Sequence, residues 1–85
     1  MYEVVFTKKA GKFIASLKKG YKDKLREVMR NLIENPFSYP YKKIRGEPNL
    51  YRIRLGRYRV LYEVDSIGRK VTILKVDERE KIYDV

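Results

Sequence analysis

Apolar residues recur with two different periods along the chain, and the change of period divides it into a helical first part and an extended second part. Tyr2–Phe6 is rich in β-branched and aromatic residues, which predicts a short strand. Thr7 can cap a helix that follows, and Gly20 is expected to end that helix. The apolar positions of this helix have the i, i+3, i+4, i+7 spacing of one buried face: Ala10, Phe13, Ile14 and Leu17.

A second apolar stripe with the same spacing predicts a second helix. Asn35-Pro36 should end it, because the residue before a proline avoids the helical region. The members of this stripe are Leu25, Val28, Met29, Leu32 and Ile33. After a proline-punctuated loop, the rest of the chain consists of short segments typical of strands: 43–45, 50–55, 58–64 and 70–76.

The order of these elements, β-α-α-β-β-β-β, indicates an α+β fold. We expect an N-terminal strand, a two-helix hairpin and then an antiparallel β-sheet, with both helices packed on one face. A chain of 85 residues has room for one core, so residues 1–85 are predicted to form a single domain. The residues from Asp77 to Val85 are expected to lie along the open side of the sheet.

Alternation within the two central strands separates apolar side chains from basic ones. Tyr51, Ile53 and Leu55 share one face, and the arginines between them share the other. If Gly56-Arg57 forms a type II′ turn, Leu55 lies opposite Tyr58. The same count pairs Arg54 with Arg59, and it puts Tyr51, Tyr58 and Tyr62 in the core. The residues expected to gather, exposed, on the face without helices are Arg52, Arg54 and Arg59.

The charge of the chain gives this arginine cluster a possible partner. Lys and Arg number 21 against 11 Asp and Glu, so the net charge is +10 and the chain should attract polyanions. Arginines that face one another repel, and they do not lose protons at neutral pH. Three on one face therefore favour a phosphate site over an ordinary solvated surface. Nearby basic residues expected to bind RNA are Lys42, Lys43, Arg45 and Arg57.

Several function classes are excluded by residues that the chain does not contain. It has no cysteine and no histidine, so disulfides, thiolate nucleophiles, Ser-His-Asp triads and histidine-ligated metals are all ruled out. We expect no cofactor and no metal. No apolar run approaches the roughly 20 residues of a membrane span, and the opening residues do not form a signal peptide, so a cytoplasmic protein is expected.

The central block of the chain resembles the RelE/ParE toxins of type II toxin–antitoxin systems. The resemblance rests on Lys43-Ile44-Arg45-Gly46, on the segments 50–56 and 58–64, and on the order of elements over nearly the whole length. Its RelE branch implies an endoribonuclease that needs the ribosome and cuts messenger RNA in the A site. It also implies an acidic cognate antitoxin and a toxin–antitoxin heterotetramer as one possible assembly.

The resemblance further implies roles for single residues. Arg52 and Arg54 match two basic strand positions of the family, and Arg59 matches its phosphate-binding arginine. Tyr83 matches a tyrosine that stacks on the messenger base; from the residues alone, this side chain either stacks on a base or holds the C-terminal residues in place. The reaction needs no metal and no protein nucleophile, because the 2′-hydroxyl of the RNA attacks and leaves a 2′,3′-cyclic phosphate.

Proton transfer is the part of this mechanism that the sequence leaves open. Asp77 stands where the resemblance implies a general-acid arginine, so Arg79 is the nearest basic candidate. Glu63 is the sole carboxylate predicted near Arg59 on the same face; we expect a salt-bridge partner first and a base second. Lowering of the 2′-hydroxyl pKa by the arginines is the alternative.

Two other functions stay open at this point. A ParE-like toxin shares the fold but poisons DNA gyrase through protein contacts and cleaves no RNA. A non-catalytic domain that binds nucleic acid or an operator would need only the +10 charge. The arginine cluster favours the endoribonuclease, because a gyrase poison has no need of a phosphate cradle.

Overall fold

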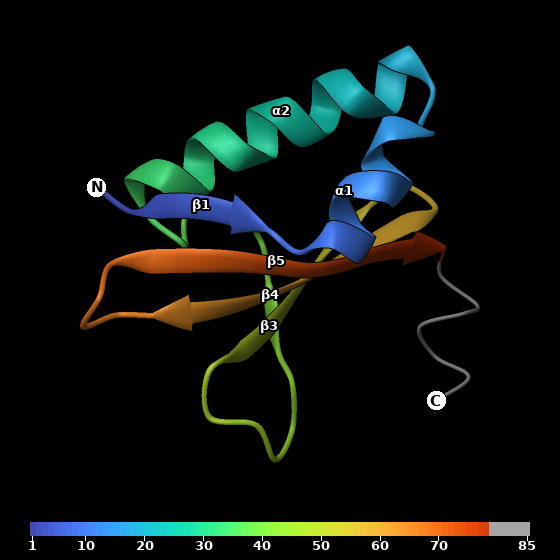
Figure 1. Cartoon of the computed structure of the whole chain (residues 1–85). Helices are drawn as coiled ribbons and strands as arrows, with labels where there is room; N and C mark the ends of the chain where they lie inside the picture. The colour runs from blue at the N-terminus through green and yellow to red at the C-terminus, as the bar shows by residue number, and fades with distance from the viewer. Residues whose placement is uncertain (79–85) are drawn as a thin grey trace.

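Two helices cover one face of a β-sheet in the computed structural model, which describes residues 1–78 (Figure 1). The elements in chain order are β1 (Glu3–Phe6), α1 (Lys8–Ala15), α2 (Lys19–Glu34), β2 (Lys42–Lys43), β3 (Leu50–Leu55), β4 (Tyr58–Asp65) and β5 (Lys70–Glu78). The predicted α+β class and element order are confirmed. Within the described residues the sheet has five strands, in the order β1-β5-β4-β3-β2.

The sheet is mixed rather than purely antiparallel. Strands β2 to β5 pair antiparallel as expected, but β1 pairs parallel with β5 and aligns Val4 with Val71. Parallel neighbours need a long connection between them. Here that connection contains both helices and three strands, so β1 can lie beside β5 at the sheet edge.

The ends of the helices follow local hydrogen bonds. The Oγ1 of Thr7 accepts from the Ala10 N–H at 3.1 Å, which confirms the predicted cap, and α2 ends before Asn35-Pro36 as predicted. The prediction that Gly20 ends the first helix is wrong. Instead, Ser16 ends α1, because its backbone N–H donates to the Phe13 carbonyl; Gly20 lies in the first turn of α2.

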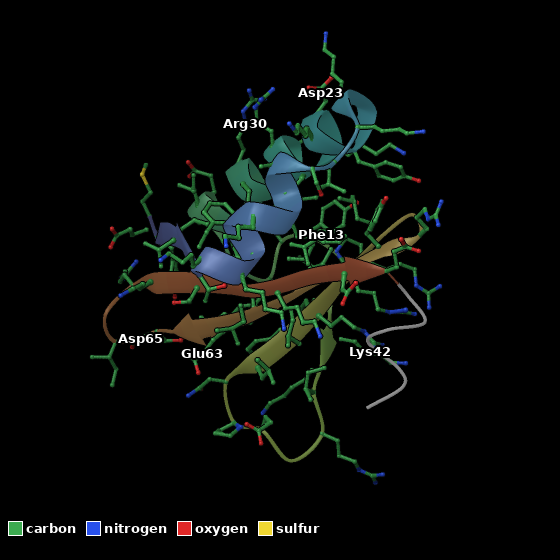
Figure 2. The ribbon with its side chains drawn as sticks, turned by 45° about the vertical axis from the view of Figure 1, so that its right-hand side comes forward. Phe13, Asp23, Arg30, Lys42, Glu63 and Asp65 are labelled. Atoms are coloured by element: carbon green, nitrogen blue, oxygen red, sulfur yellow. The ribbon has the colours of Figure 1, made fainter. Side chains whose placement is uncertain are left out.

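The core fills the space between the helices and the sheet, and Phe13 points into it (Figure 2). Tyr62 is fully buried there, as expected, and its hydroxyl donates to the Pro36 carbonyl at 3.0 Å. Burial raises the pKa of the Tyr62 phenol far above its ordinary value, and the nearby Tyr41 and Tyr51 add to this. The three tyrosines predicted for the core, Tyr51, Tyr58 and Tyr62, all pack in or against it.

A β-bulge in β5 decides which side chains of its second half face the core. Leu61 pairs with Lys75, but the next residue of β4, Tyr62, pairs with Ile73, so Leu74 is an extra residue. Beyond the bulge the alternation is reversed, and Val76 is buried against the helices. The expectation that Asp77 begins a tail is therefore wrong, because β5 continues in register to Glu78.

The hydroxyl of Thr7 links this bulge to the first helix. While its oxygen caps α1, its O–H donates to the Leu74 carbonyl at 2.8 Å. The Thr7 N–H also donates to the Ile73 carbonyl at 3.0 Å. The start of α1 and the irregularity in β5 are thus held by one residue.

Replacing Thr7 by valine should destabilise the fold. Thr7→Val keeps the shape but removes the cap and leaves the Leu74 carbonyl without its donor, so we expect the free energy of unfolding to fall by about 1–3 kcal/mol. Thr7→Ser should keep most of the stability. Urea denaturation measures both, with Thr72→Val as a control that makes the same change on the open face of β5. Equal losses at the two positions would contradict the link.

Candidate functional site

The face of the sheet without helices carries cations from four strands, in two neighbouring rows. The cross-strand pairs are Lys42 with Arg52 and Arg54 with Arg59, as the predicted hairpin register requires for the second. Lys75 extends the first row from β5, beyond Leu61. We call this surface the basic face and define it by Lys42, Arg52, Arg54, Arg59 and Lys75.

Members of the basic face differ in how far they reach into solvent. Lys42 and Arg54 are exposed and Arg52 is half-buried, but Arg59 has an exposed fraction of 0%. The prediction that Arg59 is exposed is wrong. It lies on a strand that has neighbours on both sides, opposite Arg54 on β3 and Asp77 on β5. An approaching anion meets the other cations first.

A shallow cleft opens at the outer edge of the basic face. It has a volume of about 260 Å³ and is lined by Pro40, Tyr41, Lys42, Arg52 and Arg54. Three of these five described residues are cations and none is a carboxylate. Tyr41 adds a ring that is 46% exposed. Cations beside an accessible ring suit a single-stranded nucleic acid, because the cations bind its phosphates and the ring stacks on its bases.

Two of the predicted RNA-binding residues do not join this cleft. Lys43 pairs with Tyr51 and therefore lies on the helix-covered side of the sheet edge. Arg45 lies in the loop between β2 and β3, next to Gly46. Lys43 and Arg45 are both exposed, but only Lys42 of the predicted run shares the face of the arginines.

The turn between β3 and β4 holds a third predicted RNA-binding residue, Arg57, in an ion pair. A type II′ turn requires a positive φ at its first central residue only. Gly56 has φ +63° and Arg57 has no positive φ, so the backbone agrees with the predicted turn. The Arg57 guanidinium donates to Glu78 at 2.9 Å, and this hydrogen bond raises the pKa of Arg57. The predictions for Arg79 and Tyr83 lie outside the described residues.

A carboxylate that the sequence did not place lies within the basic face. Asp77 is opposite Arg59 in the strand register, and its Oδ2 is 3.6 Å from the Lys75 Nζ. Its Oδ1 accepts from the Glu78 N–H at 2.7 Å. Glu63 does share this face, but it lies four residues from Arg59 along β4, about 13 Å away. The prediction that Glu63 is the sole nearby carboxylate is therefore wrong.

One signal in the sequence could have placed Lys75 and Asp77. The buried residues of β5 are Val71, Ile73 and Val76, so their spacing changes from two to three. Such a change of spacing is what a bulge produces in an otherwise alternating strand. Strict alternation from Val71 would have turned Lys75 and Asp77 toward the core.

The part of the chain that the structure describes, residues 1–78, contains no group of three or more acidic, histidine or cysteine side chains that could hold a metal ion. None of its helices has the length and apolarity that a membrane crossing requires.

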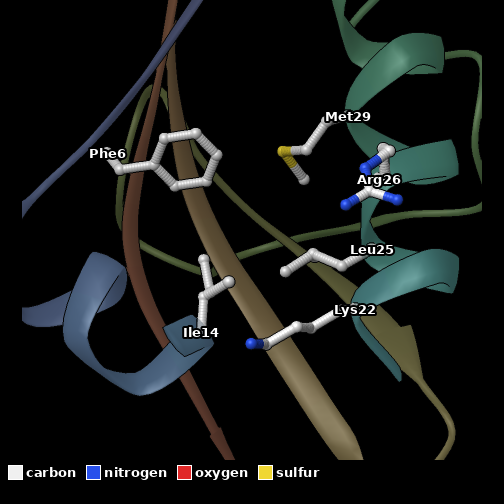
Figure 3. A pocket seen from close by; sticks show the side chains of 6 residues that line it. All are labelled: Phe6, Ile14, Lys22, Leu25, Arg26 and Met29. Atoms are coloured by element: carbon white, nitrogen blue, oxygen red, sulfur yellow. The ribbon is translucent and has the colours of Figure 1, made fainter. Parts of the chain in front are cut away.

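A second surface, which is mainly apolar where the basic face is charged, lies between β1 and the two helices (Figure 3). This groove has a volume of about 240 Å³, and apolar side chains from three elements point into it. Phe6 is 45% exposed beside it. The six residues that line the groove are Phe6, Ile14, Lys22, Leu25, Arg26 and Met29.

Comparison with known proteins places this geometry in a family. A family model described as the ParE toxin of a type II toxin–antitoxin system, parDE, matches residues 4–83. The putative toxin RelE1 of Methanocaldococcus jannaschii is 33% identical over 63 residues, which cover 71% of this chain and 70% of that protein.

Solved structures show the same fold. The isolated E. coli RelE toxin aligns with a TM-score of 0.82 at 26% identity, covering 99% of this chain and 93% of that chain. The toxin in the archaeal RelE–RelB complex from Pyrococcus horikoshii aligns with a TM-score of 0.75 at 32% identity, covering 92% and 94%.

Single-stranded RNA binding should depend on the basic face and not on cations elsewhere. Arg54→Ala removes one exposed cation of this face, so the slope of log affinity against log salt should become shallower by about 0.7–1. Lys43→Ala removes a cation from the other side and should change the slope less. Fluorescence anisotropy with a labelled oligonucleotide, over a salt series, measures both. Identical slopes for the two variants would contradict a phosphate site at Arg54.

Proposed function

The chain belongs to the RelE/ParE superfamily of type II toxins, in its RelE-like branch, and from this premise we propose that it is a ribosome-dependent endoribonuclease that cleaves messenger RNA in the A site. The observation that carries the proposal is the direct cross-strand pairing of cations on the basic face. Cations placed side by side in this way create a local positive potential, and RNA supplies a row of phosphates that this potential attracts.

The chemistry asks little of the protein beyond positioning and charge. The 2′-oxygen attacks phosphorus and the bond to the 5′-oxygen breaks, which leaves a 2′,3′-cyclic phosphate and a 5′-hydroxyl. The protein has to hold the RNA in line and offset the negative charge that grows on the phosphoryl oxygens. An enzyme that contributes only positioning and charge stabilisation depends on a substrate that is already aligned, and the ribosome provides that alignment.

Individual residues divide this work according to their exposure. Lys42, Arg52 and Arg54 reach the surface and bind the phosphates flanking the cleaved bond. Arg59 is buried opposite Arg54, so it acts on the reacting phosphate through its field. For Tyr83 and Arg79 we keep the roles that the family resemblance implies, a base-stacking ring and a proton donor.

We further propose that an acidic antitoxin neutralises this toxin by covering both of its unusual surfaces. A second similar E. coli structure, of the intact RelBE toxin–antitoxin complex, and the Pyrococcus horikoshii structure each contain RelB together with RelE. The net charge of +10 on the present chain favours an acidic partner, because opposite charges attract across an interface. The groove of Figure 3 offers that partner an apolar anchor point with Lys22 and Arg26 beside it.

Substituting Arg59 tests the proposed cleavage. Arg59→Ala should lower the rate of A-site cleavage by about 100- to 1,000-fold, because one preorganised group that stabilises the transition-state charge contributes about 2.7–4 kcal/mol. The variant should also be less stable, since Asp77 loses its cross-strand cation, so rates are compared where both proteins are folded.

The same preparation separates the competing functions. Lys43→Ala, on the other side of the sheet, should cleave like the wild type. A wild-type chain that leaves ribosome-bound messenger intact but blocks gyrase-catalysed supercoiling would replace the proposal with the ParE-like function.

Copurification tests the antitoxin. Expressed with its neighbouring gene, the chain should be recovered with a small acidic protein, and Phe6→Ala should weaken that complex about tenfold because an apolar anchor is worth more than about 1 kcal/mol. Ile67→Ala is the control, since this side chain is apolar and exposed on the turn before β5. Titration calorimetry measures the affinities. Equal weakening by both variants, or recovery of the toxin alone, would contradict the proposal.

A further inference from the structure

The bulge at Leu74 brings the Asp77 carboxylate onto the basic face, opposite Arg59. We propose that Asp77 is the general base of the reaction, which accepts the proton of the 2′-hydroxyl, and that Lys75 is the positioning residue that holds its carboxylate. This inference rests on the proposed endoribonuclease function and supplies the proton acceptor that the arginines of the basic face cannot provide.

The geometry around Asp77 fixes the carboxylate from two sides. Its Oδ1 accepts from the Glu78 N–H at 2.7 Å, and its Oδ2 faces the Lys75 ammonium at 3.6 Å. The Asp77 side chain is 14% exposed and that of Lys75 is 30% exposed. The carboxylate is thus sheltered but not sealed, and the register places it opposite Arg59. A base beside a phosphate-directed arginine lies where a 2′-hydroxyl next to that phosphate must come.

Other candidate bases among residues 1–78 lie in the wrong place. Glu63 is about 13 Å from Arg59 along the same strand. Glu78 is bound to Arg57 at 2.9 Å. The Tyr62 hydroxyl is buried and donates to a carbonyl. Since the chain has no histidine, Asp77 is the described group whose chemistry and position both suit proton acceptance.

The step balances without any further reactant. The 2′-oxygen forms a bond to phosphorus as its proton passes to Asp77 Oδ2, and the bond from phosphorus to the 5′-oxygen breaks. The departing 5′-oxygen takes its proton from the proton donor proposed above. The Lys75 ammonium stays charged throughout. It orients the Asp77 carboxylate while that group is ionised, and their attraction weakens when Asp77 becomes neutral.

Cleavage of a short messenger bound in the A site tests the role of Asp77 under single-turnover conditions. Asp77→Asn should cut about 100- to 10,000-fold more slowly, the range expected when a general base is lost. Asp77→Glu should keep more activity than Asp77→Asn. Glu63→Gln removes the same charge from the same face and should stay within about twofold of the wild type.

A messenger with sulfur in place of the 5′-bridging oxygen distinguishes a base from an acid. Because a thiolate leaves without a proton, this substrate should rescue a missing acid but not a missing base. Asp77→Asn should remain as slow on it, relative to the wild type, as on the natural messenger. Lys75→Ala should lose part of the rate on both substrates, and Lys75→Arg should restore it.

Binding of single-stranded RNA separates catalysis from folding. Removing a negative charge from the basic face should leave the affinity of Asp77→Asn equal to or higher than that of the wild type. An unchanged cleavage rate in Asp77→Asn, or its rescue by the sulfur substrate, would overturn the role of Asp77. A wild type that cleaves neither substrate would overturn the proposed function itself.

Discussion

The Thr7 hydroxyl is the small interaction on which both faces of the sheet depend. It caps α1 through the Ala10 N–H and holds the Leu74 carbonyl at the bulge of β5. Because the bulge reverses the alternation of β5, it directs Val76 into the core and Asp77 onto the basic face. The start of α1 and the bulge that directs Asp77 onto the basic face are therefore linked by the same two hydrogen bonds.

Much of this arrangement could be predicted, because local patterns specify it. The apolar spacing of the helices, the Thr7 cap and the stop at Asn35-Pro36 act within a few residues of one another. The turn at Gly56 fixes the hairpin register, and that register alone pairs Arg54 with Arg59. The end of α1 at Ser16 could not be predicted in this way, because Gly20, a common residue after helix ends, is the stronger stop signal in the sequence.

Features that join distant parts of the chain could not be predicted. The parallel pairing of β1 with β5 depends on which strands become neighbours, and the burial of Arg59 depends on the side chains that surround it in the fold. The bulge leaves a trace in the sequence, but strict alternation conceals it. For the candidate site this mattered most at Asp77, which was expected in a tail but lies on β5, at the margin of the basic face and opposite Arg59.

The pairing of β1 with β5 also constrains how the chain folds as it is made. β1 precedes its sheet partner in the chain by more than 60 residues, so it cannot pair in the sheet until β5 has been made. Contacts of such long sequence separation slow folding and make its completion cooperative. A nascent chain can therefore display the arginines of the hairpin early, but it assembles the full basic face only when β5 has joined the sheet.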